Sequence, residues 1–166
     1  MEKRVKKVLV TGGAGFIGSH IVDELLNRNY EVVVIDNLST GRRSNLPKEI
    51  TLHQIDISEK EHVESVFSIE SPDIVIHLAA QISVTESVKD PFYDGFINIM
   101  GTINLLECCK KYMVSKIVFA SSAAVYGPSD NLPIMESTDL NPLSFYGLSK
   151  MCAEHYIRLY ADLYGL

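Results

Sequence analysis

The stretch KKVLVTGGAGFIGSHIVDELL (residues 6–26) decides the fold of this 166-residue chain. The apolar run over residues 6–10 predicts a strand, and apolar side chains at helical spacing after it predict a helix. Between the two, Gly12, Gly15 and Gly18 form a G-x-x-G-x-x-G series. Glycine lets the backbone approach a pyrophosphate, and the N-terminus of a helix favours that charge. The stretch therefore predicts a dinucleotide site at a strand-to-helix turn.

The same alternation of strand and helix continues along the chain. Further strands are expected over residues 30–36, 50–56, 71–80 and 114–122, and helices over 15–29, 58–69, 91–113 and 144–165. The strand runs VLV, VVVI, IVIH and IVF lack polar alternation, which indicates a parallel sheet with helices on both faces. With right-handed crossovers, the elements predict one α/β domain over residues 1–166, a doubly wound sheet of strand order 3-2-1-4-5.

Composition limits the classes of function. The chain is 46% hydrophobic and carries a net charge of −6, which argues against a nucleic-acid surface, because phosphate binding needs clustered Lys and Arg. No apolar run approaches the roughly 18 residues of a membrane span, and the basic start, residues 1–7, is not followed by a signal peptide. The three cysteines are odd in number and favour reduced thiols in a cytoplasmic protein. Neither they nor the five histidines show metal-ligand spacing.

An acidic residue ends the second predicted strand. Asp36 lies 18 residues after Gly18, close to the ~20 typical of the acid that binds a ribose 2′-hydroxyl. A carboxylate there repels a 2′-phosphate, so NAD is favoured over NADP. Arg42 and Arg43 lie further into a polar loop, and we expect them to be solvated.

A second acidic residue follows the third predicted strand. We expect Asp56 to accept a hydrogen bond from the adenine amino group while Ile57 packs on the ring. The alternative is that Asp56 caps the next helix, and both roles are compatible. Ser58 is the expected N-cap of that helix, with Glu61 at capping-box spacing.

The end of the fourth strand carries the sequence HLAAQISV (residues 77–84). Small Ala79 and Ala80 are expected to keep a crevice open between strands one and four, where ligands bind in such sheets. His77 is expected to be a packed strand histidine rather than a catalyst. The polar stretch over residues 127–143 is too long for a passive turn, and such loops are often functional.

Three further side chains suggest acid–base chemistry. Tyr146 and Lys150 are four residues apart and share one face of a helix that Ser144 is expected to cap. A neighbouring cation favours the phenolate form of a tyrosine. Ser122 ends the fifth strand and would orient a substrate oxygen, so that Ser122, Tyr146 and Lys150 form a set around a hydride-transfer site. The alternative for Tyr146 and Lys150 is an ordinary surface pair.

Six motifs occur in the order TGGAGFIGSH, DNLSTG, HLAAQ, NIMGTINLLE, SSAAVYG and YGLSK. Together they resemble the extended short-chain dehydrogenase/reductases of the NAD-dependent epimerase/dehydratase family. The likeness is greatest to the nucleotide-sugar 4-epimerases of the UDP-glucose 4-epimerase type, and it covers essentially the whole chain.

The resemblance implies a Rossmann fold, NAD as cofactor, and site residues that follow from the motifs. The implied cofactor-binding residues are Gly12, Gly15, Phe16, Ile17, Asp36, Asn37, Ser39, Gly41, Asp56, Ile57, Leu78, Ala79, Ala80, Gln81, Asn98, Tyr146 and Lys150. The implied catalytic residues are Ser122, Tyr146 and Lys150, and the implied substrate-side residues are Ser83, Val84, Ser122 and Tyr146. No metal is implied.

The resemblance also implies a reaction and a partner. Tyr146 as phenolate would take the proton of the sugar 4-hydroxyl, C4 would be oxidised transiently, and re-reduction on the other face would interconvert UDP-glucose and UDP-galactose, a step of galactose metabolism. Members of the family continue into a C-terminal part that grips the nucleotide sugar, so this chain is expected to be an N-terminal portion with weak or no activity alone. Homodimers would form through the helices over residues 92–113 and 145–164.

Two alternatives stay open. One is a non-catalytic NAD-binding module, and the other is a different nucleotide-sugar oxidoreductase or a dehydratase. Dehydratases of the family carry an Asp-Glu pair where Ala123 and Ala124 stand, and methyl groups cannot transfer a proton. The alanines therefore favour an enzyme that only oxidises and re-reduces its substrate.

Overall fold

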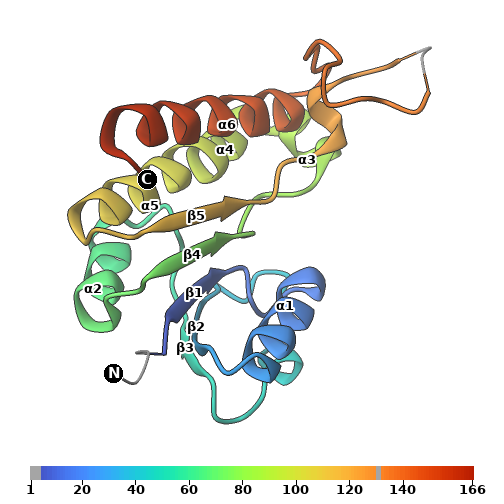
Figure 1. Cartoon of the computed structure of the whole chain (residues 1–166). Helices are drawn as coiled ribbons and strands as arrows, with labels where there is room; N and C mark the ends of the chain where they lie inside the picture. The colour runs from blue at the N-terminus through green and yellow to red at the C-terminus, as the bar shows by residue number, and fades with distance from the viewer. Residues whose placement is uncertain (1–4, 130–131) are drawn as a thin grey trace.

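A computed structural model describes residues 5–129 and 132–166 of the chain, so the first four residues of the basic start and two residues of the long polar loop lie outside it. Five strands, all paired in parallel, form one sheet of order β3-β2-β1-β4-β5 (Figure 1). The strands are β1 (Lys7–Thr11), β2 (Glu31–Ile35), β3 (Thr51–His53), β4 (Ile74–His77) and β5 (Lys116–Phe119). The predicted α/β class and strand order are confirmed.

Helices connect the strands as expected, with one short helix added. The α-helices are α1 (Phe16–Asn27), α2 (Lys60–Glu70), α3 (Val84–Lys89), α4 (Pro91–Gly95), α5 (Gly101–Lys111) and α6 (Phe145–Tyr164). The predicted helix over residues 91–113 runs from α4 to α5 through the π-helical segment η2 (Phe96–Met100). The short helix α3 was not predicted. Short π-helical turns often mark functional sites, and η2 carries one of the predicted site residues.

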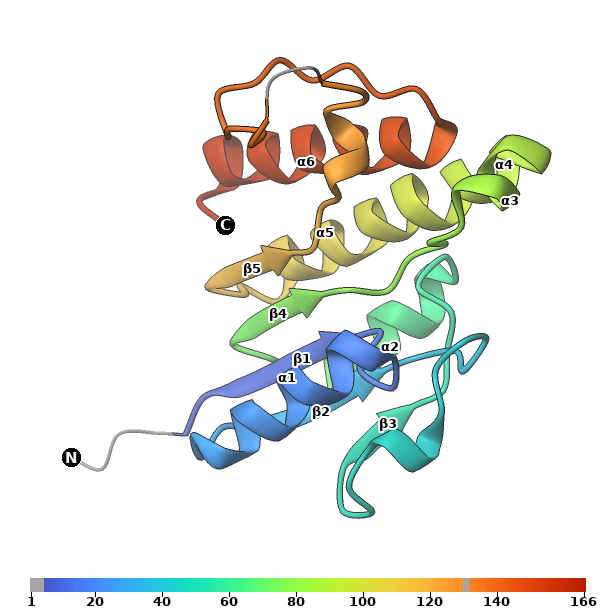
Figure 2. The same cartoon turned by 90° about the vertical axis from the view of Figure 1, so that its right-hand side faces the viewer.

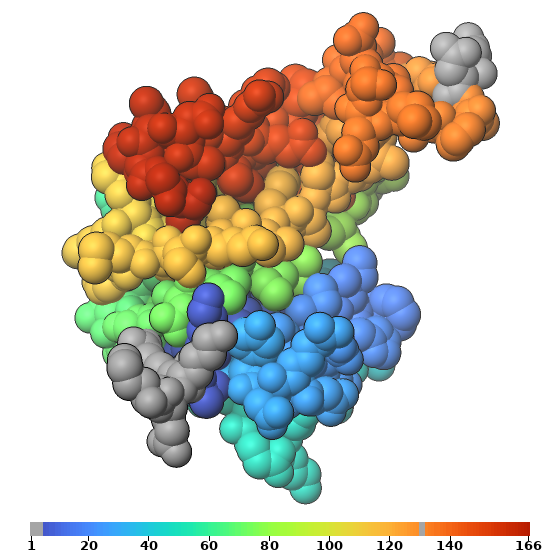
Figure 3. Space-filling view, in the orientation of Figure 1, coloured from blue at the N-terminus to red at the C-terminus, as the bar shows by residue number. Residues whose placement is uncertain are grey.

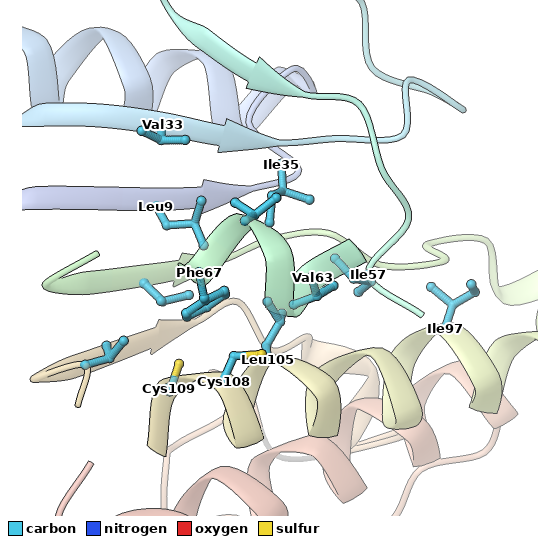
Figure 4. Close-up of a cluster of buried hydrophobic side chains, with 13 residues drawn as sticks. Leu9, Val33, Ile35, Ile57, Val63, Phe67, Ile97, Leu105, Cys108 and Cys109 are labelled. Atoms are coloured by element: carbon cyan, nitrogen blue, oxygen red, sulfur yellow. The ribbon is translucent and has the colours of Figure 1, made fainter. Parts of the chain in front are cut away.

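Both faces of the sheet bury apolar side chains, but unequally. On one face, strand residues such as Leu9 and Val75 pack with α2 and α5 around the fully buried Phe67 (Figure 4). On the other face, Val10 and its neighbours pack with α1. On β5, however, Val118 is 44% exposed. The expectation that helices cover both faces of this strand is therefore wrong for the described chain.

The two predicted helix caps have different outcomes. Ser144 caps α6, since its hydroxyl accepts the Gly147 N–H at 3.0 Å. The Ser58 prediction is wrong, because α2 begins later, at Lys60. The Ser58 hydroxyl instead donates to the Asp56 carboxylate at 2.7 Å. A local carboxylate thus competes for the serine and forms a turn before the helix.

The last helix lies beside the long helix that precedes β5. Both views of the molecule place α6 along α4 and α5, beyond the β5 edge of the sheet (Figures 1 and 2). In the space-filling view, α6 forms the upper surface and the loop before it projects to one side (Figure 3). Among the helices of the described residues, none is both long and apolar enough to cross a membrane.

Candidate cofactor and active site

The turn after β1 lies directly against the loop after β4. Gly12 has a φ of +70°, and a Cβ there would lie 2.7 Å from the Ala79 nitrogen. The Thr11 hydroxyl accepts N–H groups from Leu78 and Ala79, both at 3.2 Å. From these two strand ends the chain passes to opposite faces of the sheet, to α1 and to α5. This is the switch point where ligands bind in open α/β sheets.

The N-terminus of α1 points a set of backbone N–H groups at this switch point. Gly15 is the N-cap residue, no side chain caps the helix, and its first turn holds no acidic residue. Phe16 and Ile17 open the helix with side chains that are 79% and 63% exposed. A Cβ on Gly18 would lie 2.2 Å from the Gly12 oxygen, so glycine permits this close packing of helix on turn. The first-turn N–H groups suit an anion such as a pyrophosphate.

Asp36 stands just beyond the end of β2, 7% exposed. One carboxylate oxygen accepts the Ala14 N–H at 2.9 Å and the other accepts the Leu38 N–H at 2.8 Å. A Cβ on Gly41 would lie 2.9 Å from Oδ1 of this carboxylate, so the loop closes tightly over the acid. Each carboxylate oxygen keeps a lone pair for a further hydrogen bond, such as one from a ribose hydroxyl.

Arg43 is held within its own loop rather than solvated, which corrects the expectation for this residue. Its guanidinium donates to four backbone oxygens, those of Leu46, Pro47, Lys48 and Ile50, at 2.9–3.3 Å. A guanidinium committed to carbonyl groups has fewer donors for a 2′-phosphate. Arg42 is exposed in the same loop, as the sequence predicts, and only its backbone N–H is bound, donating to the Ala14 oxygen at 3.0 Å.

The turn after β3 brings Asp56 to the loop after β2. The Asn37 amide donates to one Asp56 oxygen at 2.7 Å, and the Ser58 N–H donates to the other at 2.9 Å. The Asn37 carbonyl in turn accepts the Ser39 N–H at 3.0 Å. The alternative that Asp56 caps α2 is therefore wrong, because Glu59 is the N-cap residue and the Asp56 carboxylate forms the turn before the helix.

The Ile57 side chain does not face a ring-binding surface. It is 3% exposed within the core cluster, and a Cβ on Gly101 would lie 2.7 Å from its Cδ1 atom. The expected packing of this side chain on adenine is wrong, because the core already surrounds it (Figure 4). The backbone of Ile57 remains at the end of the adenine-side loop.

The π-helical segment places Asn98 under the loop that follows β4. Its carbonyl oxygen accepts the Gln81 N–H at 2.8 Å, and its amide donates to the Gln81 oxygen at 3.0 Å. The same amide donates to the Ser149 hydroxyl of α6 at 3.1 Å. Asn98 therefore links the cofactor-side loop, where Ala79 and Ala80 are half-buried, to the helix that carries Tyr146 and Lys150.

Two neighbouring positions were expected on the substrate side. Ser83 caps α3, since its hydroxyl accepts the Glu86 N–H at 3.2 Å. Val84 follows it with a side chain that is 46% exposed. The Gln81 amide donates to the Ser83 oxygen at 2.9 Å, so this short helix is fixed to the same loop.

His77 is a packed strand residue, as the sequence predicts. It is 1% exposed, and its two ring nitrogens bond the hydroxyls of Thr11 at 2.7 Å and Thr102 at 3.0 Å. Burial, and secondarily the charge of Lys150, lower the pKa of His77 to about 3. The ring is therefore neutral at physiological pH and holds strand ends together.

The chain after β5 brings Ser122 next to the first turn of α6. The Ser122 hydroxyl caps the short 3-10 helix η3 (Ala123–Val125) by accepting the Ala124 N–H at 3.2 Å. A Cβ on Gly147 would lie only 2.5 Å from the Ala124 oxygen, so η3 and α6 touch through backbone. Tyr146, the residue before Gly147, is half-buried at this junction.

Lys150 lies one turn further along α6 and is 3% exposed. Its Nζ lies 4.3 Å from the centroid of the Phe119 ring, at the end of β5. Burial lowers the pKa of Lys150 to about 8, against the opposing charges of Asp94 and Glu154. Such a lysine is a cation near neutral pH but titrates in the mildly alkaline range.

Sequence reasoning missed one buried acid in this region, Asp94 of α4. It is 0% exposed, and its Oδ1 accepts the Gln81 amide at 3.1 Å and the Asn98 amide at 3.2 Å. No pattern marked it, since an isolated Asp near the start of a helix usually faces solvent.

The predicted residues thus fall into groups that the fold brings to the carboxyl-terminal ends of the strands. Hydrogen bonds and close backbone contacts join the glycine turn, the loop after β4 and the Asn98 network at the β1/β4 switch point, and Ser149 joins α6 to them. Asp36 and Asp56 lie on the same side of the sheet, just after the carboxyl-terminal ends of β2 and β3.

Comparisons with known proteins agree with this arrangement. The family described as "NAD dependent epimerase/dehydratase family" matches residues 8–166. The chain is 52% identical over 160 residues to a putative UDP-glucose 4-epimerase of Methanocaldococcus jannaschii, covering 96% of this chain and 52% of that protein. It is 43% identical over 158 residues to UDP-glucose 4-epimerase of Bacillus subtilis, covering 91% of this chain and 47% of that one. The chain thus spans about half the length of these curated relatives.

Solved structures show the same fold. The UDP-glucose 4-epimerase of Thermus thermophilus, in complex with NAD, superposes with a TM-score of 0.93 at 49% identity, covering 96% of this chain and 52% of that chain. That of Thermotoga maritima, with UDP-glucose, also gives a TM-score of 0.93, at 43% identity and the same two coverages. With the family matching nearly the whole sequence and the fold shared, this chain belongs to the NAD dependent epimerase/dehydratase family.

Proposed function

We propose that residues 1–166 form the NAD-binding domain of an enzyme that interconverts UDP-glucose and UDP-galactose by epimerisation at C4. The observation that carries the proposal is the junction of α6 with the β1/β4 switch point, where the Asn98 amide donates to the Ser149 hydroxyl. We assign the acid–base set to this junction and the dinucleotide to the glycine turn beside it. The names of the relatives support the choice of UDP-hexose and of NAD.

The residues present fit NAD. The uncapped N-terminus of α1 and the glycine turn suit a pyrophosphate, and the buried Asp36 suits ribose hydroxyls. When bound, NAD would accept a hydride from the sugar C4 and return it. We assign the NAD contacts to the residues that the motifs predict, with the exception of the Ile57 side chain.

The chain's own residues would handle the proton. Tyr146 would take the proton of the 4-hydroxyl as a phenolate and return it after the hydride comes back. Lys150, a buried cation, would stabilise that phenolate. The Ser122 hydroxyl accepts one N–H and keeps its hydrogen to donate, so it would orient the reacting oxygen. Ser83 and Val84 would lie on the substrate side.

Cofactor choice and turnover test the proposal together. We expect the protein to bind NAD at least about tenfold more tightly than NADP, because Asp36 repels a 2′-phosphate. Calorimetric titration with each nucleotide measures this ratio. The product of the natural reading frame should convert UDP-galactose to UDP-glucose without net release of NADH, whereas the 166-residue chain alone should do so slowly or not at all.

Other outcomes would identify other functions. Net release of NADH with an oxidised sugar would point to a dehydrogenase, and loss of water would point to a dehydratase. Tight NAD binding by the product of the natural reading frame, with no turnover of any UDP-hexose, would favour a binding module. A full epimerase rate from the 166-residue chain would contradict the expected need for a substrate-gripping part.

The two long helices also support a homodimer. Apolar side chains, most of them three or four residues apart, leave one stripe on each helix exposed to solvent by 40–80%. The stripe residues are Phe92, Phe96 and Met100 on α4 and η2, and Leu148, Tyr156, Leu159 and Leu163 on α6. Two copies that pair these stripes would bury them as a four-helix contact.

A charge within the stripe should weaken the dimer. We expect Leu159→Glu to raise the dimer dissociation constant by about 30-fold or more, because truncating or charging a central interface residue costs about 2 kcal/mol. Sedimentation velocity across a concentration series measures it. Ile69→Glu, a comparably exposed apolar position on α2, is the control and should leave the dimer intact. A monomeric wild-type protein would refute the pairing.

A cytoplasmic location is part of the proposal as well. All three cysteines carry free thiols among the described residues, and Cys108 and Cys109 are buried. Unpaired thiols are typical of proteins kept in a reducing compartment.

A further inference from the structure

Asp94 is buried at the centre of the link between the β4 loop and α6. Its Oδ1 accepts amide groups from Gln81 and Asn98, and Asn98 also donates to the Ser149 hydroxyl. Ser149 in turn donates to the Tyr146 oxygen at 3.0 Å. The carboxylate is therefore one end of a hydrogen-bonded path to the backbone of the proposed catalytic tyrosine.

The second oxygen of this carboxylate has no such partner. Within the described residues, Asp94 Oδ2 is the one buried side-chain N or O atom that has no hydrogen-bond partner. An isolated buried carboxylate is costly unless an opposite charge compensates it. Burial raises the pKa of Asp94, while the Ser149 hydroxyl, the Lys150 charge and the Gln81 amide oppose that rise.

Lys150 is the matching cation. It is 3% exposed, and the described residues offer its Nζ a ring face but no hydrogen-bond acceptor. The groups coupled to its charge are Asp94 from α4, Glu154 from α6 and His77 from β4. Tyr146 lies one turn before it on α6. His77 is neutral, and of the two acids Asp94 has the larger effect on Lys150. Asp94 is thus the main negative charge acting on Lys150, and Lys150 is the positive charge acting on Asp94, next in effect to the Ser149 hydroxyl.

We propose that Asp94 is a positioning residue for the active site, whose buried carboxylate supplies the negative charge for the buried Lys150 and, through Asn98 and Ser149, fixes the turn that carries Tyr146. The charge interaction is a property of the folded chain. Its importance for turnover rests on the proposed function, because only there does Lys150 need to stay protonated.

Asp94→Asn separates charge from shape, since an amide oxygen can still accept at the Oδ1 position. We expect Lys150 to titrate at lower pH in this variant, because the charge that favours the ammonium form is gone. NMR of ¹³Cε-labelled lysine follows the titration, with the Lys150 signal assigned by Lys150→Arg. Glu86→Gln on the adjacent helix α3 removes one acidic charge that pairs with the exposed Lys89 and should leave the titration unchanged. An unchanged Lys150 titration in folded Asp94→Asn would overturn the proposal.

A second variant tests the same coupling from the other side and leaves Asp94 in place. Interaction between two sites is reciprocal, so Lys150→Met should make Asp94 titrate at higher pH than in the wild type. Carboxyl-observed ¹³C NMR reads that titration even if Asp94→Asn does not fold. Identical Asp94 titrations with and without the lysine charge would also overturn the proposal.

The pH profile of turnover connects the coupling to function. In Asp94→Asn, the alkaline limb of kcat/KM should move to lower pH, with about tenfold lower activity on that limb for each pH unit of displacement. A merely structural role would lower activity equally at all pH values, and that result would refute the functional part of the proposal. If the wild type neither binds NAD nor turns over UDP-hexose, the proposed function fails, while the two NMR titrations still decide the charge interaction.

Discussion

Tyr146→Phe is expected to lower kcat for UDP-galactose epimerisation by about 10²–10⁴-fold while leaving NAD affinity within about twofold. The substitution removes one hydroxyl that would act as the proton acceptor, and loss of a positioned acid–base group has an effect of that size. The backbone oxygen of Tyr146 still accepts the Ser149 hydroxyl, so the local hydrogen bonds and the position of Lys150 should persist. Steady-state kinetics on the product of the natural reading frame, with calorimetry for NAD, measures both quantities.

The control for Tyr146→Phe is a second tyrosine on α6. Tyr164→Phe removes a hydroxyl from the same helix at a position that is 51% exposed, and it should leave kcat unchanged. If Tyr146→Phe lost NAD binding as severely as turnover, the Tyr146 hydroxyl would act mainly by holding the cofactor or the fold. The assigned role in proton transfer would then be wrong.

Gly18→Ala is expected to destabilise the fold by about 1–3 kcal/mol and to weaken NAD binding by about tenfold or more. A Cβ at this position would lie 2.2 Å from the Gly12 oxygen and 2.7 Å from the Gly13 Cα. Both are backbone atoms, so helix α1 must move away from the glycine turn, and overpacking of this kind has a cost of that size. The same movement displaces the N–H groups that would face the pyrophosphate. Urea unfolding and NAD titration measure the two effects.

Gly95→Ala is the matched control, because the same methyl group meets open space. Gly95 ends α4 with helical dihedral angles and has no atom within 4 Å of an added Cβ. Alanine is the better helix former, so this variant should be equal to or up to about 1 kcal/mol more stable than the wild type. If Gly18→Ala retained wild-type stability and NAD affinity, the close helix-on-turn contact would not be essential to the cradle.

The pattern of apolar runs was sufficient to predict the sheet. Parallel strands buried on both faces are almost wholly apolar, and short connections with a fixed handedness leave few ways to order them. The start of α6 was equally predictable, because Ser144 acts on an N–H three residues away. Local interactions of this kind are contained in the sequence itself. The Ser58 cap failed for a related reason, since a second local acceptor, Asp56, bonds the same hydroxyl.

The burial of Ile57 and Asp94 was decided only by the tertiary structure. The sequence presents Ile57 beside Asp56 at a strand end, but the core that surrounds its side chain comes from α2 and α5. It also presents Asp94 as one acid among many near a helix start. Its burial depends on where the β4 loop and α6 pack, and on a lysine 56 residues further along the chain.

The sequence by itself therefore determined the βαβ framework, the glycine turn and the residue types of the site, because these depend on periodicity and on neighbours within a few residues. The tertiary structure decided which of those residues meet, and in which charge state. A buried charge depends on every group within several ångströms, whatever its distance along the chain. The pairing of Asp94 with Lys150 belongs to this second class.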